Sequence, residues 1–143
     1  MLNKKLINGF EVNPIGIGTW LVGGGMFDDK TPYAVYEHDQ AEIAAIRHAL
    51  SLGQNHIDTA QLYGAGHTEE IVGEAMRGFD RGKIFLASKI WKSHASRAAV
   101  PRAVEQMLTR LKTSHLDLLY MHAPWPEVSI EECLCGMCDA VGA

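Results

Sequence analysis

The sequence lacks any apolar run approaching the roughly 18 residues that cross a membrane, and its start carries Lys4 and Lys5 without the long apolar stretch of a signal peptide. It also lacks an excess of positive charge. The formal net charge is -4, the pI is near 5.9, and the lysines and arginines are scattered along the chain. A basic surface for nucleic acid or an anionic membrane is therefore not expected. These absences favour a cytoplasmic protein that acts on a small molecule.

Cysteine is scarce, and the three cysteines, Cys133, Cys135 and Cys138, crowd one end of the chain. An odd number in one cluster argues against a secreted disulfide framework. A structural zinc site needs four ligands, whereas this cluster offers three, so small apolar residues on a helix are the favoured interpretation. No metal site is expected. Five histidines without metal-ligand spacing are interpreted as surface or locally hydrogen-bonded residues: His48, His56, His67, His94 and His115.

What the sequence does have is enough apolar residues for a real core. The 143 residues are 47% hydrophobic and 21% charged, which is typical of one globular domain over residues 1–143. Asn8-Gly9 between two short β-prone segments predicts an opening hairpin with a type I′ turn. The stretch 21–36, with three consecutive glycines and Pro32, is expected to be a loop that could line a pocket.

After this stretch, apolar strands alternate with amphipathic helices. Strands are predicted at 15–18, 56–58, 84–88 and 116–121, and helices after Asp39, at about 68–76, from Pro101, and after Ser129. Asp39 with Glu42 and Ser129 with Glu132 each form a capping-box pattern. Continuous apolar strands that alternate with helices indicate an α/β fold with a parallel sheet. The alternation alone leaves a barrel and an open sheet as alternatives.

Polar residues capable of carbonyl chemistry follow three of the predicted strands. Asp58 ends the strand 56–58, Tyr63 lies in the loop after it, Lys89 ends the next strand, and His122 ends the last. Each alone has an ordinary explanation, as a cap, a loop aromatic, a solvated charge or a core histidine. Because the carboxyl ends of parallel strands meet on one face, we expect the four side chains to converge.

Their chemistry is mutually consistent. An ammonium such as that of Lys89 stabilises a neighbouring tyrosinate, and so makes the phenol of Tyr63 a better acid. Asp58 would hold Lys89 by an ion pair, while Tyr63 and His122 would donate to a carbonyl oxygen that gains negative charge as hydride arrives. The cluster therefore predicts reduction of an aldehyde or ketone. The tryptophans near strand ends are candidates for the walls of a substrate pocket: Trp20, Trp91 and Trp125.

One common cofactor-binding motif is incomplete in this sequence. Gly16-Ile17-Gly18 begins like a dinucleotide fingerprint, but Leu21 occupies the place of the third glycine, so a Rossmann site is not supported.

Three segments of the chain resemble motifs of the aldo-keto reductase family. They are His56 to Gly64 with its continuation to Gly73, Phe85 to Lys89, and Asp117 to His122; Gly16 to Trp20 and the opening hairpin fit as well. The resemblance implies a TIM barrel and NADP(H) as cofactor. It also implies that Tyr63 is the general acid, that Lys89 and Asp58 adjust its pKa, and that His122 orients the substrate. It also implies that Asp58 touches the nicotinamide ribose region. His122 in place of a glutamate favours carbonyl over alkene reduction.

An eight-unit (β/α)8 barrel takes about 250 residues, so this chain is expected to be its N-terminal half: four β/α units after a β-hairpin. Two functional interpretations follow. The first is a reductase represented by the N-terminal half of its barrel. The second is a non-catalytic half-barrel that serves as an assembly or interaction module, including self-association, through its two exposed sheet edges.

Overall fold

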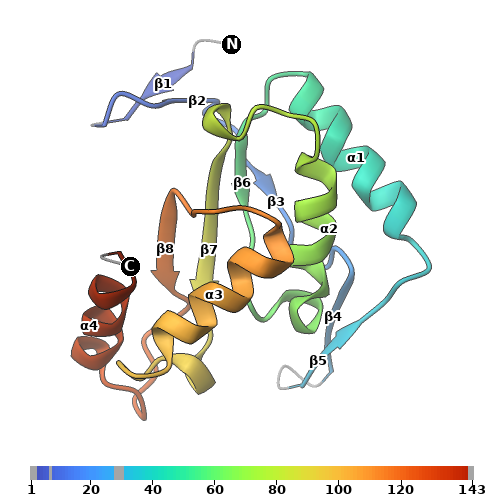
Figure 1. Ribbon diagram of the computed structural model, residues 1–143. Coiled ribbons are helices and arrows are strands. Elements are labelled where there is room, and N and C mark those ends of the chain that lie inside the picture. Colours follow the sequence, from blue (N-terminus) through green and yellow to red (C-terminus); the bar gives the residue numbers. More distant parts are fainter. Residues whose placement is uncertain (1–2, 7, 28–30, 142–143) are drawn as a thin grey trace.

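The computed structural model describes residues 3–6, 8–27 and 31–141 (Figure 1). Its centre is a parallel sheet of four strands in the spatial order β3-β6-β7-β8. These are β3 (Ile17–Gly18), β6 (His56–Asp58), β7 (Phe85–Ile90) and β8 (Leu118–Met121). A helix follows each strand: α1 (Asp39–Ser51), α2 (His67–Met76), α3 (Val100–Leu111) and α4 (Ile130–Val141). The predicted α/β fold is confirmed, with strand ends displaced by one or two residues.

The helices α1, α2 and α3 lie in chain order over one face of the sheet, and α4 lies next to β8 (Figure 1). The core is the layer between helices and sheet. Ile57 and Leu86 of the strands are fully buried against Val72, Met107 and Leu111 of the helices. Burial of each such side chain contributes about 1.5–3 kcal/mol, which is why the helical apolar stripes face the sheet.

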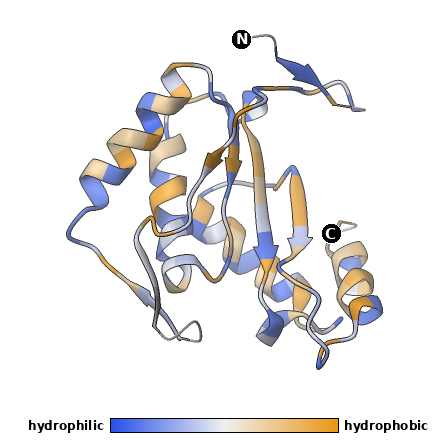
Figure 2. Cartoon of the chain, turned by 180° about the vertical axis from the view of Figure 1, so that it is seen from behind, coloured by the Kyte–Doolittle hydropathy of each residue, from blue (hydrophilic) through white to orange (hydrophobic). Residues whose placement is uncertain are grey.

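Successive residues of β7 point to opposite faces of the sheet, as the twofold period of a strand requires. Leu86 and Ile90 enter the core on the helix side, and Ser88 between them contacts Glu69 of α2. Lys89 points to the other face. Seen from behind, the body of β7 is hydrophobic and its carboxyl end is hydrophilic (Figure 2).

The opening hairpin is present as β1 (Lys4–Lys5) and β2 (Glu11–Val12), which pair antiparallel. Its turn differs from the prediction, because positive φ in the Asn8-Gly9 pair is confined to Gly9. A type I′ turn needs positive φ at both residues, so that assignment is wrong. The remaining residue of the turn, Ile7, lies outside the described residues.

The expectation of a loop over 21–36 is also wrong. The segment contains a second antiparallel ribbon, β4 (Gly24–Phe27) and β5 (Thr31–Ala34). Glycine allows it: φ of Gly24 is +136°, and a Cβ there would lie 2.0 Å from the carbonyl oxygen of Tyr33. Pro32 is tolerated because a two-stranded ribbon has only edge strands.

The capping box predicted at the start of α1 does not form. The cap residue is His38, and the side chains of Asp39 and Glu42 bond elsewhere. Asp39 accepts from His67, and Glu42 accepts the backbone N–H of Gly23 at 2.9 Å. At α4, by contrast, the N–H of Glu132 donates to Ser129 Oγ at 3.2 Å, which is one of the two bonds of the predicted capping box.

The three cysteines lie on α4, as predicted, and are free. Only Cys133 enters the core, and burial raises the pKa of its thiol. Among the described residues, no group of three His, Cys, Asp or Glu side chains is placed to hold a metal ion. No helix in the described part of the chain is long and apolar enough to cross a membrane.

Candidate active site

Lys89 is the centre of a polar cluster at the carboxyl end of the sheet. Its Nζ donates to Asp58 Oδ2 at 2.8 Å, to the Thr59 carbonyl at 2.9 Å and to the Tyr63 hydroxyl at 3.1 Å. These three contacts match the three protons of an ammonium group. The side chain is 16% exposed. Lys89 is thus held as a fixed positive charge beside the phenol oxygen.

Asp58 is placed by the strand pairing. Its neighbour across β3 is Gly18, and Thr19 donates both its N–H and its hydroxyl to the Asp58 carbonyl. The carboxylate is 39% exposed and faces Lys89 with one oxygen. Asp58 therefore anchors Lys89 while its side chain remains open to solvent.

Tyr63 begins the short helical turn η1 (Tyr63–Gly66), whose backbone is unusual. Gly64, Ala65 and Gly66 all have positive φ, at 53°, 54° and 96°. A Cβ at Gly64 would lie 2.6 Å from the carbonyl oxygen of Gly23, so only glycine fits there. The left-handed turn returns the chain directly to α2 and leaves the Tyr63 ring over Lys89, with Nζ 4.8 Å from the ring centroid.

His122 follows β8, and its backbone N–H donates to the Ile90 carbonyl at 3.0 Å, which fixes the position of the residue. Burial lowers the pKa of its imidazole below the ordinary value of 6.5, and the positive charge of Lys89 lowers it further, against the opposing effect of Asp58. Its Nδ1 is buried without a hydrogen-bond partner among the described residues. A neutral imidazole with one N–H is therefore favoured at neutral pH.

The three tryptophans proposed as pocket walls all lie at this cluster. Trp20 packs edge-on against Tyr63 at 4.8 Å between ring centroids, and Trp91 packs edge-on against His122 at 5.2 Å. Trp125 packs against Trp91 at 5.0 Å. Trp20 is 48% exposed. The polar cluster thus lies within an aromatic rim, and every residue predicted from the sequence is brought to this one place.

Sequence reasoning missed residues that support this cluster from the other side of the sheet. Glu69 is fully buried; it accepts from Ser88 Oγ at 2.8 Å and from Arg110 Nε at 2.7 Å. Burial raises the pKa of the Glu69 carboxyl against the opposing effects of Arg110 and Ser88. The terminal Nη2 of Arg110 is 2.6 Å from the same carboxylate but lacks hydrogen-bond geometry. Arg110 also touches Gly66, where a Cβ would lie 3.1 Å from Nε.

The sequence predicts no supporting role for Gln61, and it favours a surface or locally hydrogen-bonded position for His67, which is in fact buried. The side chain of Gln61 accepts the Trp91 backbone N–H at 3.1 Å, and so joins the Tyr63 loop to the end of β7. His67, at the start of α2, bonds Glu70 at 2.8 Å and Asp39 at 2.9 Å. Only the position of Gln61, between Asp58 and Tyr63, offered a signal in the sequence; Asp39 and His67 are too far apart in the chain for any spacing rule.

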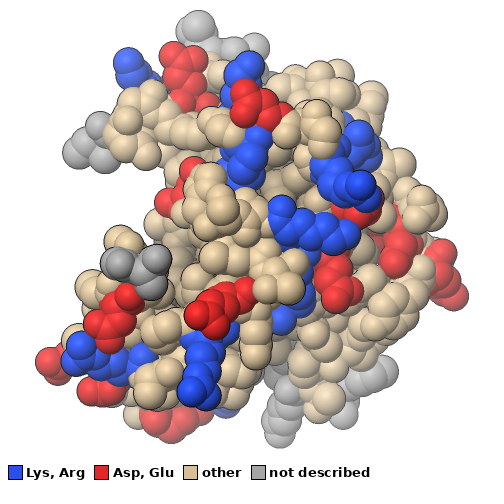
Figure 3. Space-filling view, viewed as in Figure 1, with Lys and Arg blue, Asp and Glu red and all other residues tan. Residues whose placement is uncertain are grey.

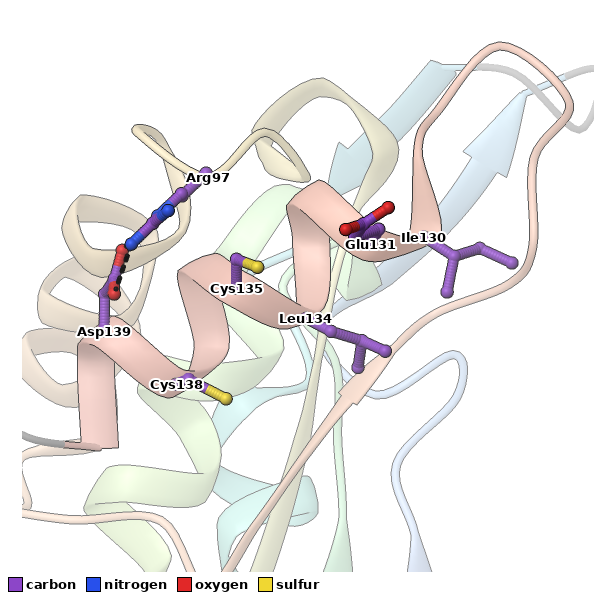
Figure 4. Close-up of a pocket in the computed structure, with 7 residues that line it drawn as sticks. All are labelled: Arg97, Ile130, Glu131, Leu134, Cys135, Cys138 and Asp139. Carbon is purple, nitrogen blue, oxygen red and sulfur yellow. Dashed lines mark hydrogen bonds and ion pairs between the residues drawn. The ribbon is translucent and has the colours of Figure 1, made fainter.

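One hollow in the surface of the described residues lies away from this cluster. It has a volume of about 530 Å³ and lies along the outer side of α4, between Arg97, Ile130, Leu134 and Cys138 (Figure 4). A smaller one, of about 340 Å³, lies beside Gln61, Trp91 and Arg110. Neither hollow is lined by Asp58, Tyr63, Lys89 or His122.

Comparison with known proteins gives a consistent result. The family model for the aldo/keto reductase family matches residues 14–141. An aldo-keto reductase of Bacillus subtilis (strain 168), YhdN, is 42% identical over 136 residues, covering 87% of this chain and 38% of that protein. The methylglyoxal reductase YeaE of Escherichia coli (strain K12) is 39% identical over 108 residues, covering 76% of this chain and 34% of that protein.

Solved structures agree. A thermostable aldo-keto reductase crystallised with the inhibitor epalrestat superposes with a TM-score of 0.89 at 38% identity, covering 99% of this chain and 50% of that one. An aldo/keto reductase of Klebsiella pneumoniae in complex with NADP and acetate gives a TM-score of 0.83 at 34% identity, with coverages of 98% and 45%. The fold is that of half of a (β/α)8 barrel, and the chain spans half or less of the length of these relatives. This chain belongs to the aldo/keto reductase family.

Proposed function

We propose that the polar cluster reduces an aldehyde or ketone to an alcohol with NADPH, in a barrel of which this chain is the N-terminal half. The observation that supports this most strongly is the contact between Lys89 Nζ and the Tyr63 hydroxyl, because it pairs an acid with a fixed positive charge. NADPH, when bound, supplies the hydride that the carbonyl carbon accepts.

Each residue then has one task. Tyr63 donates its hydroxyl proton to the carbonyl oxygen as negative charge develops there. Lys89 stabilises the phenolate that remains, and Asp58 keeps Lys89 in place at 2.8 Å. His122, neutral because burial and Lys89 lower the pKa of its imidazole, donates an N–H to the same oxygen and orients the substrate.

The residues present fit a nicotinamide cofactor on this face. Asp58 is partly exposed and uses Oδ2 for Lys89, which supports the proposal that its other oxygen accepts a hydrogen bond from a ribose hydroxyl. A Cβ at its neighbour Gly18 would meet no described atom within 4 Å, so the space beside Asp58 is open to a flat ring.

The aromatic rim suggests the kind of substrate. Trp20, Trp91 and Trp125 present flat apolar faces around the two proton donors, which suits a small carbonyl compound better than a charged polymer. Two of the relatives are methylglyoxal reductases, from Escherichia coli and Yersinia pestis. We therefore propose methylglyoxal as the first substrate to assay.

The test is NADPH oxidation with methylglyoxal by the purified chain and by Tyr63→Phe. Loss of a positioned general acid should lower turnover by about 10²–10⁴-fold. NADPH affinity, measured by calorimetry, should change little, because the phenol acts on the carbonyl rather than on the cofactor.

Tyr120→Phe is the matched control, because it removes the phenol oxygen of a residue on β8 that is 45% exposed and takes no part in the proposed proton transfer. It should retain full turnover. If Tyr63→Phe reduced methylglyoxal as fast as the unmodified chain, the assignment of the acid would be wrong.

A further inference from the structure

Charged side chains of both signs lie interspersed on the face of the molecule seen in Figure 3. Several exposed ones form ion pairs, such as Arg97 with Asp139 and Lys112 with Glu74. Because exposed pairs of this kind are solvated and contribute little, they give no reason to place a binding site at them. A buried polar side chain is more informative, because it is retained in the interior only with a partner.

Gln61, in the loop after β6, is such a side chain. It is 9% exposed, and its side-chain oxygen accepts the backbone N–H of Trp91 at 3.1 Å. The carbonyl of the same peptide group, that of Ile90, accepts the backbone N–H of His122 at 3.0 Å. The two bonds therefore hold one planar peptide group from opposite sides.

The side chain of Gln61 takes the place of a backbone acceptor. Past the end of β6, the N–H of Thr59 donates to the Ala87 carbonyl at 3.0 Å. One step further, the N–H of Gln61 donates to the Lys89 carbonyl at 3.2 Å. The chain then turns away into η1, and the N–H of Trp91 is left to the Gln61 amide. Since β6 and β7 are the two inner strands of the sheet, this chain itself supplies both neighbours of each.

Two groups that would orient a substrate depend on the peptide between Ile90 and Trp91. Trp91 carries its N–H, and His122 donates to its carbonyl. The two rings also pack edge-on, at 5.2 Å between centroids. A shift of this peptide would therefore move the indole of Trp91 directly and the imidazole of His122 through its backbone N–H.

The proposed acid and its cation are held by other contacts. Lys89 Nζ donates to Asp58 and to the Thr59 carbonyl, and it also contacts the Tyr63 hydroxyl. None of these three bonds involves the side chain of Gln61. Removal of that side chain should therefore disturb the placement of a substrate rather than the transfer of a proton to it.

We propose that Gln61 is a positioning residue for the carbonyl substrate. By holding the peptide between Ile90 and Trp91, its side chain sets where Trp91 and His122 contact the substrate. This inference rests on the proposed function, because the orientation of these two rings matters only if a carbonyl compound binds at the polar cluster.

The first test is steady-state turnover of methylglyoxal by Gln61→Met and Gln61→Glu. Methionine has a similar length but only a weak sulfur acceptor, so KM should rise about 3–10-fold, with kcat within about twofold of the unmodified chain. Glutamate keeps an oxygen acceptor, and Gln61 lines the hollow beside Arg110, so this variant should keep KM near the original value.

Gln106→Met is the matched control, because it makes the same change at an exposed position of α3 that lines the same hollow. It should leave KM and kcat unchanged. Gln61→Asn keeps the amide but is one methylene shorter, so it should behave like Gln61→Met and replaces that variant if the methionine chain does not fold.

The second measurement needs no turnover. Hydrogen exchange of backbone amides, followed by NMR, reports directly on the N–H of Trp91. Gln61→Met should speed exchange at Trp91 about 3–10-fold, because the N–H loses its acceptor. Exchange at Thr59 should not change, since its bond to the Ala87 carbonyl remains.

The outcomes separate this inference from the proposed function. Faster exchange at Trp91 with an unchanged KM would make Gln61 a structural link only, and would overturn this inference alone. Unchanged exchange, or a fall in kcat without a rise in KM, would also overturn it. If the unmodified chain neither bound nor reduced methylglyoxal, the proposed function would fail and this inference with it, whereas the exchange data would still show whether Gln61 holds the peptide.

Discussion

Two ion pairs lie on opposite faces of the sheet, next to adjacent residues of β7, and the two regions differ in what surrounds them. Behind the sheet, Ser88 contacts Glu69, which is fully buried and paired with Arg110. In front, Lys89 contacts Asp58, which is 39% exposed. The carboxylate of the rear pair is enclosed by the protein, whereas the carboxylate of the front pair is open to solvent. The same strand therefore separates a group that stabilises the fold from a group that we propose acts on a substrate.

The rear pair should show the largest effect on stability. Arg110→Met leaves the Glu69 carboxylate buried without its cation, which should cost about 3–5 kcal/mol in the free energy of unfolding. The loss should shrink at low pH, because burial already raises the pKa of Glu69 and a protonated carboxyl needs no cation. Denaturant unfolding at several pH values measures both effects.

A matched control uses an exposed pair. Arg77 bonds Glu74 at 2.9 Å, with side chains 69% and 36% exposed. Arg77→Met should leave the unfolding midpoint nearly unchanged, as exposed ion pairs contribute little. If Arg110→Met and Arg77→Met lowered the free energy of unfolding equally, buried and exposed ion pairs would not differ in their contribution to stability.

The front pair should affect turnover more than stability. Asp58→Asn keeps the shape of the side chain but removes the charge that holds Lys89. A hydrogen bond to a charged group contributes about 1.5–3 kcal/mol, so turnover with methylglyoxal should fall about 10–100-fold. The unfolding midpoint should change little, because solvent reaches the site. A variant with lower stability and full turnover would contradict this division.

Two histidines should make the free energy of unfolding depend on pH. Their effects should be smaller than those above and opposite in sign to each other, because their pKa shifts are opposite. At His67, burial by itself lowers the imidazole pKa, but the hydrogen bonds and charges of Glu70 and Asp39 outweigh it and raise the pKa above 6.5. Its stabilisation is therefore complete below pH 6.5 and is lost as the pH rises through the pKa of the folded state. At His122 the pKa is lowered, so its stabilisation is present above pH 6.5 and is lost on acidification.

Unfolding free energies across this pH range can separate the two. His67→Gln should remove the loss of stability on the alkaline side, and His122→Gln the loss on the acid side. If both variants changed the slope of unfolding free energy against pH in the same way, the two pKa values would not be shifted in opposite directions.

The front region can be predicted from the sequence because its residues follow a local pattern, whereas the rear region cannot because its residues are far apart in the chain. Asp58, Lys89 and His122 each end an apolar strand, and parallel topology alone brings strand ends together. Glu69 and Arg110 lie 41 residues apart on two helices, and no local spacing indicates that they meet. On the sequence Glu69 is one more helical acid, and only the packing of α2 against α3 and β7 buries it.

The same reasoning explains the errors. Gly23-Gly24-Gly25 and Pro32 indicate a loop by local preference, yet they form a ribbon because an isolated strand pair tolerates both residue types. Asp39 and Glu42 fit a capping box, but tertiary partners, His67 and the Gly23 N–H, take their carboxylates. Local patterns succeed where local geometry decides the structure and fail where a distant partner competes.

The most direct test of the central claim compares two neighbouring substitutions on β7, Lys89→Met and Ser88→Ala, by unfolding and by NADPH-dependent turnover. We expect Lys89→Met to abolish turnover with a small change in stability. Ser88→Ala removes a buried hydrogen bond to Glu69, so it should cost about 1–3 kcal/mol of stability and retain turnover where the protein is folded. If both variants lost turnover and stability in proportion, β7 would not separate chemistry from folding, and the account would be wrong.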